Sequence, residues 1–120
     1  MSKSRILVVE DQALLRWHAV DMIENAGFIA LEAEDADAAI ASLKLSADVQ
    51  LVFTDIEMPG SMDGIQLAAL IRDRWPSMHV IVTSGREPVD VSTLPAGCPF
   101  VAKPPMWPAL IETMRCLTAA

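Results

Sequence analysis

The sequence predicts an α/β fold in which helices cover both faces of a parallel β-sheet. Five short apolar runs alternate with segments of helical periodicity, which is the pattern of repeated strand–helix units. The first run, Ile6-Leu7-Val8-Val9, has no polar interruption, as expected for a strand covered on both sides. The 120 residues contain no linker, repeat or low-complexity stretch, so we predict one domain over residues 1–120.

The first half of the chain is predicted to hold three strands and two helices. After the first strand, apolar residues recur at helical spacing at Leu15, Ala19, Met22, Ile23 and Ala26. Gly27 suits the end of that helix. Residues 28–33 form a second, weaker strand, and Asp35 can cap a helix over residues 36–43. Residues 51–54 form the third strand.

The second half continues the alternation. A helix is predicted at residues 64–74, followed by strands at 79–83 and 100–103 and a final helix at 108–117. The segment at 87–97 carries two prolines and two valines, which are poor helix formers. We therefore expect only a short or irregular helix between the last two strands.

The chain has a formal charge of −7, and the acidic excess lies in its first half. Residues 1–60 carry eleven Asp and Glu against four Lys and Arg, whereas residues 61–120 carry five against five. Such a chain is a poor binder of nucleic acid, which requires clustered basic residues. It is better suited to cations and basic partner surfaces.

The apolar runs are short, and the two cysteines follow no metal-binding spacing. No run approaches the roughly 20 residues of a membrane helix, and the first is too short for a signal peptide. We therefore predict a cytoplasmic protein with no membrane association. Cys98 and Cys116 are expected to be reduced, unreactive thiols.

Chemically active side chains stand at the carboxyl ends of the predicted strands, where ligands bind in parallel sheets. They comprise three carboxylates, two hydroxyls and one ammonium. The residues are Glu10 and Asp11, Asp55, Thr83 and Ser84, and Lys103. Their strands place all of them at one edge of the sheet.

Carboxylates gathered in this way repel one another, at a cost of about 3 kcal/mol per pair at ~5 Å. A divalent cation offsets this repulsion, and Mg²⁺ prefers carboxylate and carbonyl oxygens with retained waters. Asp11 and Asp55 are the predicted direct ligands. Glu10 is expected to act through a metal-bound water or by contacting the direct ligands. The backbone carbonyl of Glu57 is a further candidate ligand.

Mg²⁺ beside a fixed lysine is typical of sites for phosphoryl transfer, because this reaction depends on positioning and charge stabilisation. Aspartate can act as the nucleophile toward phosphorus. We therefore predict that Asp55 accepts a phosphoryl group. Its new oxygens would meet Mg²⁺, the Lys103 ammonium and the Thr83 hydroxyl.

From about residue 5 to residue 117 the chain resembles the receiver domain of bacterial two-component response regulators. The matching motifs are ILVVED at 6–11, VFTDIEMPG at 52–60, Gly64, VIVTSG at 80–85 and FVAKPP at 100–105. The resemblance implies a flavodoxin-like, five-stranded parallel sheet in the order 2-1-3-4-5.

The resemblance also implies a role for each site residue. Asp55 would be the phosphoacceptor, and Glu10 and Asp11 would be the acidic pair that binds Mg²⁺. Thr83 would be a switch hydroxyl that moves toward the phosphoryl group. Lys103 would correspond to the lysine that is typical of this site in the family, and its peptide bond to Pro104 would be cis.

Two departures from the usual family pattern affect the surroundings of the site. Residues 60–63 form a loop with one residue more than usual, which should alter partner contacts and leave the chemistry intact. The resemblance implies that Phe100 would stand where an aromatic side chain of the family swings inward on activation. It lacks the hydroxyl of the more familiar tyrosine, so any such switch would depend on packing alone.

The leading functional prediction is a phosphorylatable signalling receiver with no output domain. A histidine kinase or phosphotransfer protein would donate the phosphoryl group, and an unknown downstream protein would read the signal by direct contact. The chain would not be a turnover enzyme, since it would catalyse only its own phosphorylation and dephosphorylation. A homodimer is left open.

Two alternatives remain. A receiver-like interaction module would never be phosphorylated. An Asp-nucleophile phosphohydrolase would be expected to carry Asp-x-Asp and a cap domain, whereas this chain has Asp55-Ile56-Glu57. His18 lies mid-helix, away from the strand ends, and is not expected to relay phosphoryl groups. Trp17 and Trp107 are interpreted as packing residues, whereas an exposed tryptophan would instead indicate a partner surface.

Overall fold

The computed structural model of the protein describes residues 3–46, 48–85, 91–95 and 97–119. Five parallel strands form one sheet in the order β2-β1-β3-β4-β5, which confirms the order implied by the resemblance. The strands are β1 Arg5–Val9, β2 Ile29–Ala33, β3 Val49–Asp55, β4 His79–Ser84 and β5 Phe100–Ala102. The helices are α1 Ala13–Asn25, α2 Ala36–Leu45, α3 Gly64–Arg74 and α4 Trp107–Thr118.

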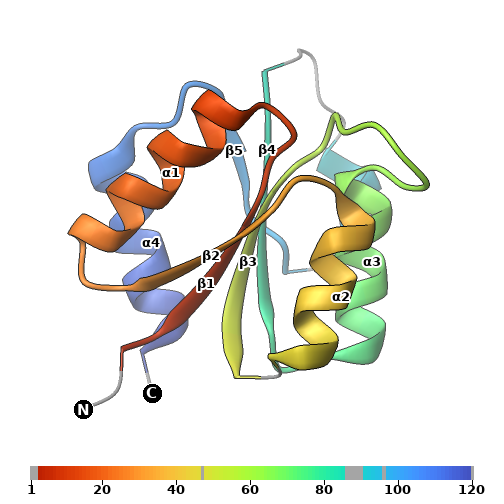
Figure 1. Ribbon diagram of the computed structural model, residues 1–120, viewed down its shortest axis with the longest axis horizontal. Coiled ribbons are helices and arrows are strands. Elements are labelled where there is room, and N and C mark those ends of the chain that lie inside the picture. The colour runs from red at the N-terminus through yellow and green to blue at the C-terminus, as the bar shows by residue number, and fades with distance from the viewer. Residues whose placement is uncertain (1–2, 47, 86–90, 96, 120) are drawn as a thin grey trace.

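Helices cover the sheet on both sides, with α1 and α4 on one face and α2 and α3 on the other (Figure 1). Strand β1 supplies both cores, because Leu7 and Val9 pack toward α2 and α3 while Ile6 and Val8 pack toward α1 and α4. All four side chains are at most 1% exposed. This double burial explains why the run at the start of the chain has no polar residue.

The helix ends follow local side-chain chemistry. The Asp35 carboxylate accepts a hydrogen bond from the Ala38 amide at 2.8 Å, which confirms the predicted cap of α2. Asp63 and Gln66 form a reciprocal capping box at the start of α3, a feature absent from the prediction. This box ends the longer loop at 60–63 and directs the chain back to the sheet.

The segment between β4 and β5 contains a 3-10 turn, η1, at Val91–Thr93. The expected irregular helix at 87–97 is confirmed to that extent, and residues 87–90 and 96 lie outside the described part of the chain. The Lys103–Pro104 peptide bond is cis, as implied by the resemblance.

Cys98 is buried, Cys116 is exposed, and both are free thiols. Among the described residues, no helix has the length and apolar character needed to span a bilayer.

Gly64 lets the start of α3 press against the carboxyl end of β3. Its amide donates to the Ile56 carbonyl at 2.9 Å. A Cβ atom at this position would overlap the Asp55 carbonyl and lie 2.8 Å from the Ile56 Cα. Glycine is therefore required here by the close approach of two backbones, and this approach fixes the main chain beside Asp55.

We predict that Gly64→Ala lowers the free energy of unfolding by about 3 kcal/mol, because backbone atoms cannot yield to a new methyl group as a flexible side chain can. Urea unfolding measures the loss. Gly85→Ala is the matched control, since its Cβ would meet only Lys103 side-chain carbons at 3.8 Å. Equal stability of the two variants would contradict the steric argument.

Candidate functional site

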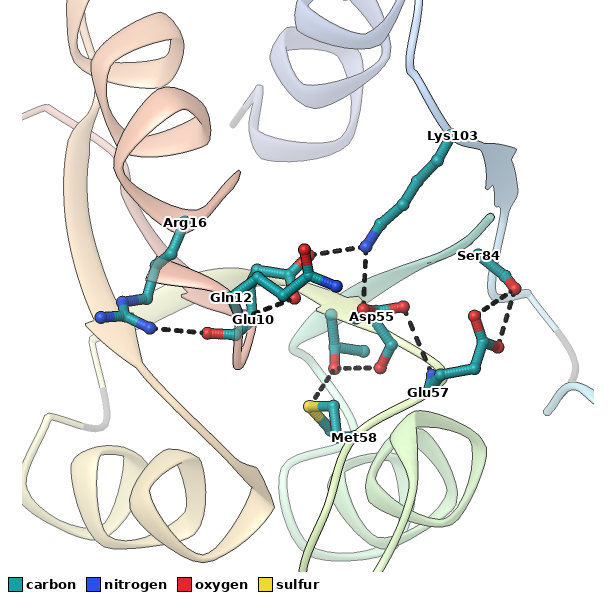
Figure 2. A network of polar contacts seen from close by, with 9 residues as sticks. Glu10, Gln12, Arg16, Asp55, Glu57, Met58, Ser84 and Lys103 are labelled. Atoms are coloured by element: carbon teal, nitrogen blue, oxygen red, sulfur yellow. Dashed lines mark hydrogen bonds and ion pairs between the residues drawn. The ribbon is translucent and has the colours of Figure 1, made fainter. Parts of the chain in front are cut away.

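The strand register brings the predicted site residues to one edge of the sheet, and Figure 2 shows Glu10, Asp55 and Lys103 meeting there. Asp55, the last residue of β3, pairs with Thr83 of β4, and Thr83 pairs with Val101 of β5. Val9, which ends β1, pairs with Thr54, so Glu10 follows at the level of Asp55. Lys103 comes directly after β5.

Lys103 lies between two buried carboxylates. Its Nζ atom is 2.6 Å from Glu10 Oε1 and 2.8 Å from Asp55 Oδ2. Burial lowers the pKa of the Lys103 ammonium, but the hydrogen bonds and charges of Asp55 and Glu10 outweigh burial and raise it above its ordinary value. The lysine is therefore held in its charged form as the counter-ion of the carboxylate cluster.

The three predicted carboxylates form one group. Oxygen atoms of Glu10, Asp11 and Asp55 lie within 4.8 Å of one another. Burial raises the pKa of Asp11, with a further increase from its hydrogen bond to Glu10. Mg²⁺ prefers oxygen ligands, carboxylates among them, so this all-oxygen donor set would fit the ion.

Thr83 presents a buried hydroxyl on the strand next to Asp55. Its Oγ1 atom has no hydrogen-bond partner among the described residues, although the residue is only 3% exposed. Leaving such a group unpaired costs about 1–3 kcal/mol. A ligand with acceptor oxygens beside Asp55 would relieve this cost.

Glu57 makes contacts that the sequence analysis did not predict. Its amide donates to Asp55 Oδ1 at 3.3 Å, and its carboxylate oxygens accept from the Ser84 hydroxyl at 2.6 and 2.7 Å. Ser84 is thus more than a polar residue at a strand end. Ser84 could be placed at this edge because the carboxyl ends of parallel strands meet there. Its partner Glu57 lies 27 residues earlier in the chain, and the sequence does not show that the two side chains meet.

The aromatic residues have different environments. Phe100 is half-buried at the start of β5 and packs on the core beside α2 and α3. Trp107 stacks edge-on against Phe53 and His18, so its prediction as a packing residue is confirmed. The same prediction for Trp17 is wrong, because its position on α1 leaves it 57% exposed.

His18 and Trp107 also line a cavity of about 410 Å³. The cavity runs between α1 and the segment after β5, and its lining includes Asp55 and Lys103. His18 is mid-helix as predicted, yet the cavity connects its surroundings to the polar site.

The chain matches the response regulator receiver domain over residues 6–113. It belongs to this family. The response regulator protein FleR of Pseudomonas aeruginosa is 37% identical over 87 residues, which cover 72% of this chain and 18% of FleR. The chain spans less than half the length of the curated relatives it matches.

Solved receiver structures share the fold. A response regulator receiver protein from Sinorhizobium medicae superposes with a TM-score of 0.88 at 27% identity, covering 97% of this chain and 94% of that chain. The response regulator TrrA of Thermotoga maritima, solved in complex with Mg²⁺ and BeF, has a TM-score of 0.80 at 25% identity, covering 95% and 98%.

We predict that Lys103→Met destabilises this receiver domain by about 2 kcal/mol at neutral pH, because two buried carboxylates lose their cation. These contacts raise the pKa of Lys103 above its ordinary 10.5. The stability that Lys103 adds to the wild type is therefore complete well below pH 10.5, and it is lost as the pH rises through the raised pKa of the folded chain.

Urea unfolding from pH 7 to pH 11 tests this dependence. Lys44→Met, which removes an exposed lysine from the last turn of α2, is the control and should have little effect. A Lys103→Met deficit that stays constant above pH 10.5 would contradict the ion-pair explanation.

Proposed function

We propose that this chain is a phosphorylatable receiver in which Asp55 accepts a phosphoryl group from a histidine kinase or a phosphotransfer protein. One observation carries the proposal. The Asp55 carboxylate is buried, bonded to the Lys103 ammonium, and grouped with the carboxylates of Glu10 and Asp11. A carboxylate held in this way is oriented for attack and cannot move freely into solvent.

In the proposed reaction an Asp55 oxygen attacks the phosphorus of a phosphohistidine. The new P–O bond forms as the P–N bond breaks, and the imidazole nitrogen takes back the electron pair. Lys103 and the Thr83 hydroxyl then meet the phosphoryl oxygens. Their positions around Asp55 support these roles, because Lys103 carries a fixed charge and the Thr83 hydroxyl has no hydrogen-bond partner within the described part of the chain.

Asp11 and Asp55 are the proposed direct Mg²⁺ ligands, with the Glu57 backbone carbonyl as a further oxygen and Glu10 acting through water. Mg²⁺ would supply neutralisation of the charge on the transferred phosphoryl oxygens. The all-oxygen donor set supports the choice of a hard cation. The TrrA structure, solved with Mg²⁺ and BeF, supports it by analogy within the family.

Phosphorylation is proposed to shift a pre-existing equilibrium between two conformations. Thr83 would move toward the phosphoryl group, and Phe100 would follow by packing alone. Residues 1–120 are proposed to act as one receiver domain that signals by contact with a downstream protein. A kinase or phosphotransfer partner and a homodimer are both compatible with this arrangement.

We predict that incubation with acetyl phosphate and Mg²⁺ adds one phosphoryl group to the wild-type chain and none to Asp55→Asn. Intact-protein mass spectrometry measures the gain, and chelation of Mg²⁺ should prevent it. Asp48→Asn is the matched control, because Asp48 precedes the opposite end of the same strand and pairs with Arg5.

The outcomes separate the alternatives. Failure of the wild type to take up phosphoryl from acetyl phosphate, or from any kinase tested, would favour an interaction module that is never phosphorylated. Continuous hydrolysis of excess phosphomonoester would favour the phosphohydrolase. Labelling of Asp55→Asn at the wild-type level would place the phosphoryl group elsewhere.

An exposed apolar surface on α1 supports a protein partner. Leu14 is 77% exposed and Trp17 is 57% exposed, and the two lie three positions apart on the helix that follows Asp11. Large apolar side chains exposed together next to a reactive site are characteristic of partner contacts. A docked donor would place its phosphohistidine close to Asp55.

We predict that Leu14→Ala combined with Trp17→Ala slows phosphotransfer from a partner kinase by about 10-fold or more, because interface aromatics contribute strongly to binding. Labelling by acetyl phosphate should be unchanged, since the small donor needs no docking surface. Leu45→Ala, at an 88% exposed position at the end of α2, is the control. Equal slowing with both donors would contradict a docking role.

A further inference from the structure

The segment that carries Asp11 is bonded on both sides of this residue. The Glu10 amide donates to the Ala33 carbonyl at 3.0 Å and the Arg16 amide donates to the Gln12 carbonyl at 2.9 Å. The Gln12 amide donates to Glu10 Oε2 at 3.2 Å. Asp11 and Gln12 lie between β1 and α1, outside both elements. Gln12 stands at the N-cap of α1 but makes no side-chain capping hydrogen bond. None of these three bonds involves the Glu10 carbonyl, which precedes Asp11 directly.

Arg16, in the first turns of α1, bonds directly to this segment (Figure 2). Its Nη1 atom donates to the Glu10 backbone carbonyl at 2.9 Å. Its Nε atom donates to Glu32 Oε1 at 3.1 Å, and the Arg16 side chain is only 15% exposed. The guanidinium thus joins α1 to the end of β1 and to β2.

The two contacts of Arg16 affect Asp11 in different ways: one holds the backbone before Asp11, and the other orients the guanidinium itself. The Glu10 carbonyl belongs to the peptide unit that leads into Asp11, and this unit is planar. Fixing the carbonyl oxygen therefore fixes the plane from which Asp11 departs. Glu32 lies on β2 opposite Val8 of β1, so a rigid part of the sheet holds the guanidinium in the required orientation.

We propose that Arg16 is a positioning residue for the Mg²⁺ site: by bonding the Glu10 carbonyl, it aims the Asp11 carboxylate at Asp55. The inference rests on the proposed function of this cluster. A lysine would keep the charge but lacks the planar fork needed to serve two acceptors on different elements. The charge of Arg16 itself repels a cation, so its favourable contribution comes from geometry.

The test is the Mg²⁺ affinity of the folded chain, measured by calorimetric titration of the wild type, Arg16→Lys and Arg16→Ala. We expect binding about 10-fold weaker in both variants, the scale typical of groups that orient metal ligands. Arg16→Lys is the decisive variant because it preserves charge. Glu32→Gln should weaken binding in the same direction, by a smaller factor.

Arg5→Ala is the matched control. It removes an arginine of β1 whose Nε bonds Asp48 Oδ2 at 2.8 Å, at the end of β1 opposite to Glu10. A metal-free measurement complements the titration. Amide hydrogen exchange at residues 11–13 should be faster in Arg16→Lys than in the wild type or in Arg5→Ala, with the remaining amides unchanged.

Wild-type Mg²⁺ affinity in folded Arg16→Lys would overturn the positioning role and leave the proposed function standing. Absence of Mg²⁺ binding by the wild type would overturn both. If Arg16→Ala does not fold, Arg16→Lys and Glu32→Gln still decide the matter, since each retains a polar side chain of similar size.

Discussion

The site depends on a single ammonium group between two buried carboxylates. A parallel sheet brings the carboxyl ends of its strands together, and here those ends carry Glu10 and Asp55 with Asp11 beside them. Without a cation, each close pair would cost about 3 kcal/mol at ~5 Å. Lys103 bonds both Glu10 and Asp55, so the acidic cluster can persist in the folded chain before any metal binds.

The surroundings of this ion-pair network restrict the movement of each member. Gly64 allows α3 to start against the backbone of Asp55, and Ser84 holds the Glu57 carboxylate at the end of β4. Arg16 holds the main chain at Glu10. The contacts join different elements at separations from 6 residues (Arg16–Glu10) to 27 residues (Ser84–Glu57), and together they convert a set of strand ends into a site with fixed geometry.

The sequence was sufficient to predict the sheet and the acidic edge, because both follow from apolar periodicity and from the rule that parallel strands end together. It was insufficient for contacts that depend on side-chain reach. The Ser84–Glu57 and Arg16–Glu10 bonds join groups whose orientation is set by tertiary packing. Trp17 was misread because a large aromatic residue is more often buried than exposed, and the sequence does not show which face of α1 is left uncovered.

The bonds that Lys103 and Thr83 make in this structure would change if Asp55 is phosphorylated. Lys103 divides its bonds between Glu10 and Asp55, whereas Thr83 makes none among the described residues. A phosphoryl group would bring acceptor oxygens within reach of both, and satisfying the Thr83 hydroxyl alone would recover about 1–3 kcal/mol. A tenfold shift in an equilibrium needs about 1.4 kcal/mol. If Asp55 is phosphorylated as proposed, pairing a hydroxyl that has no partner among the described residues would therefore supply enough free energy to bias a switch between two conformations.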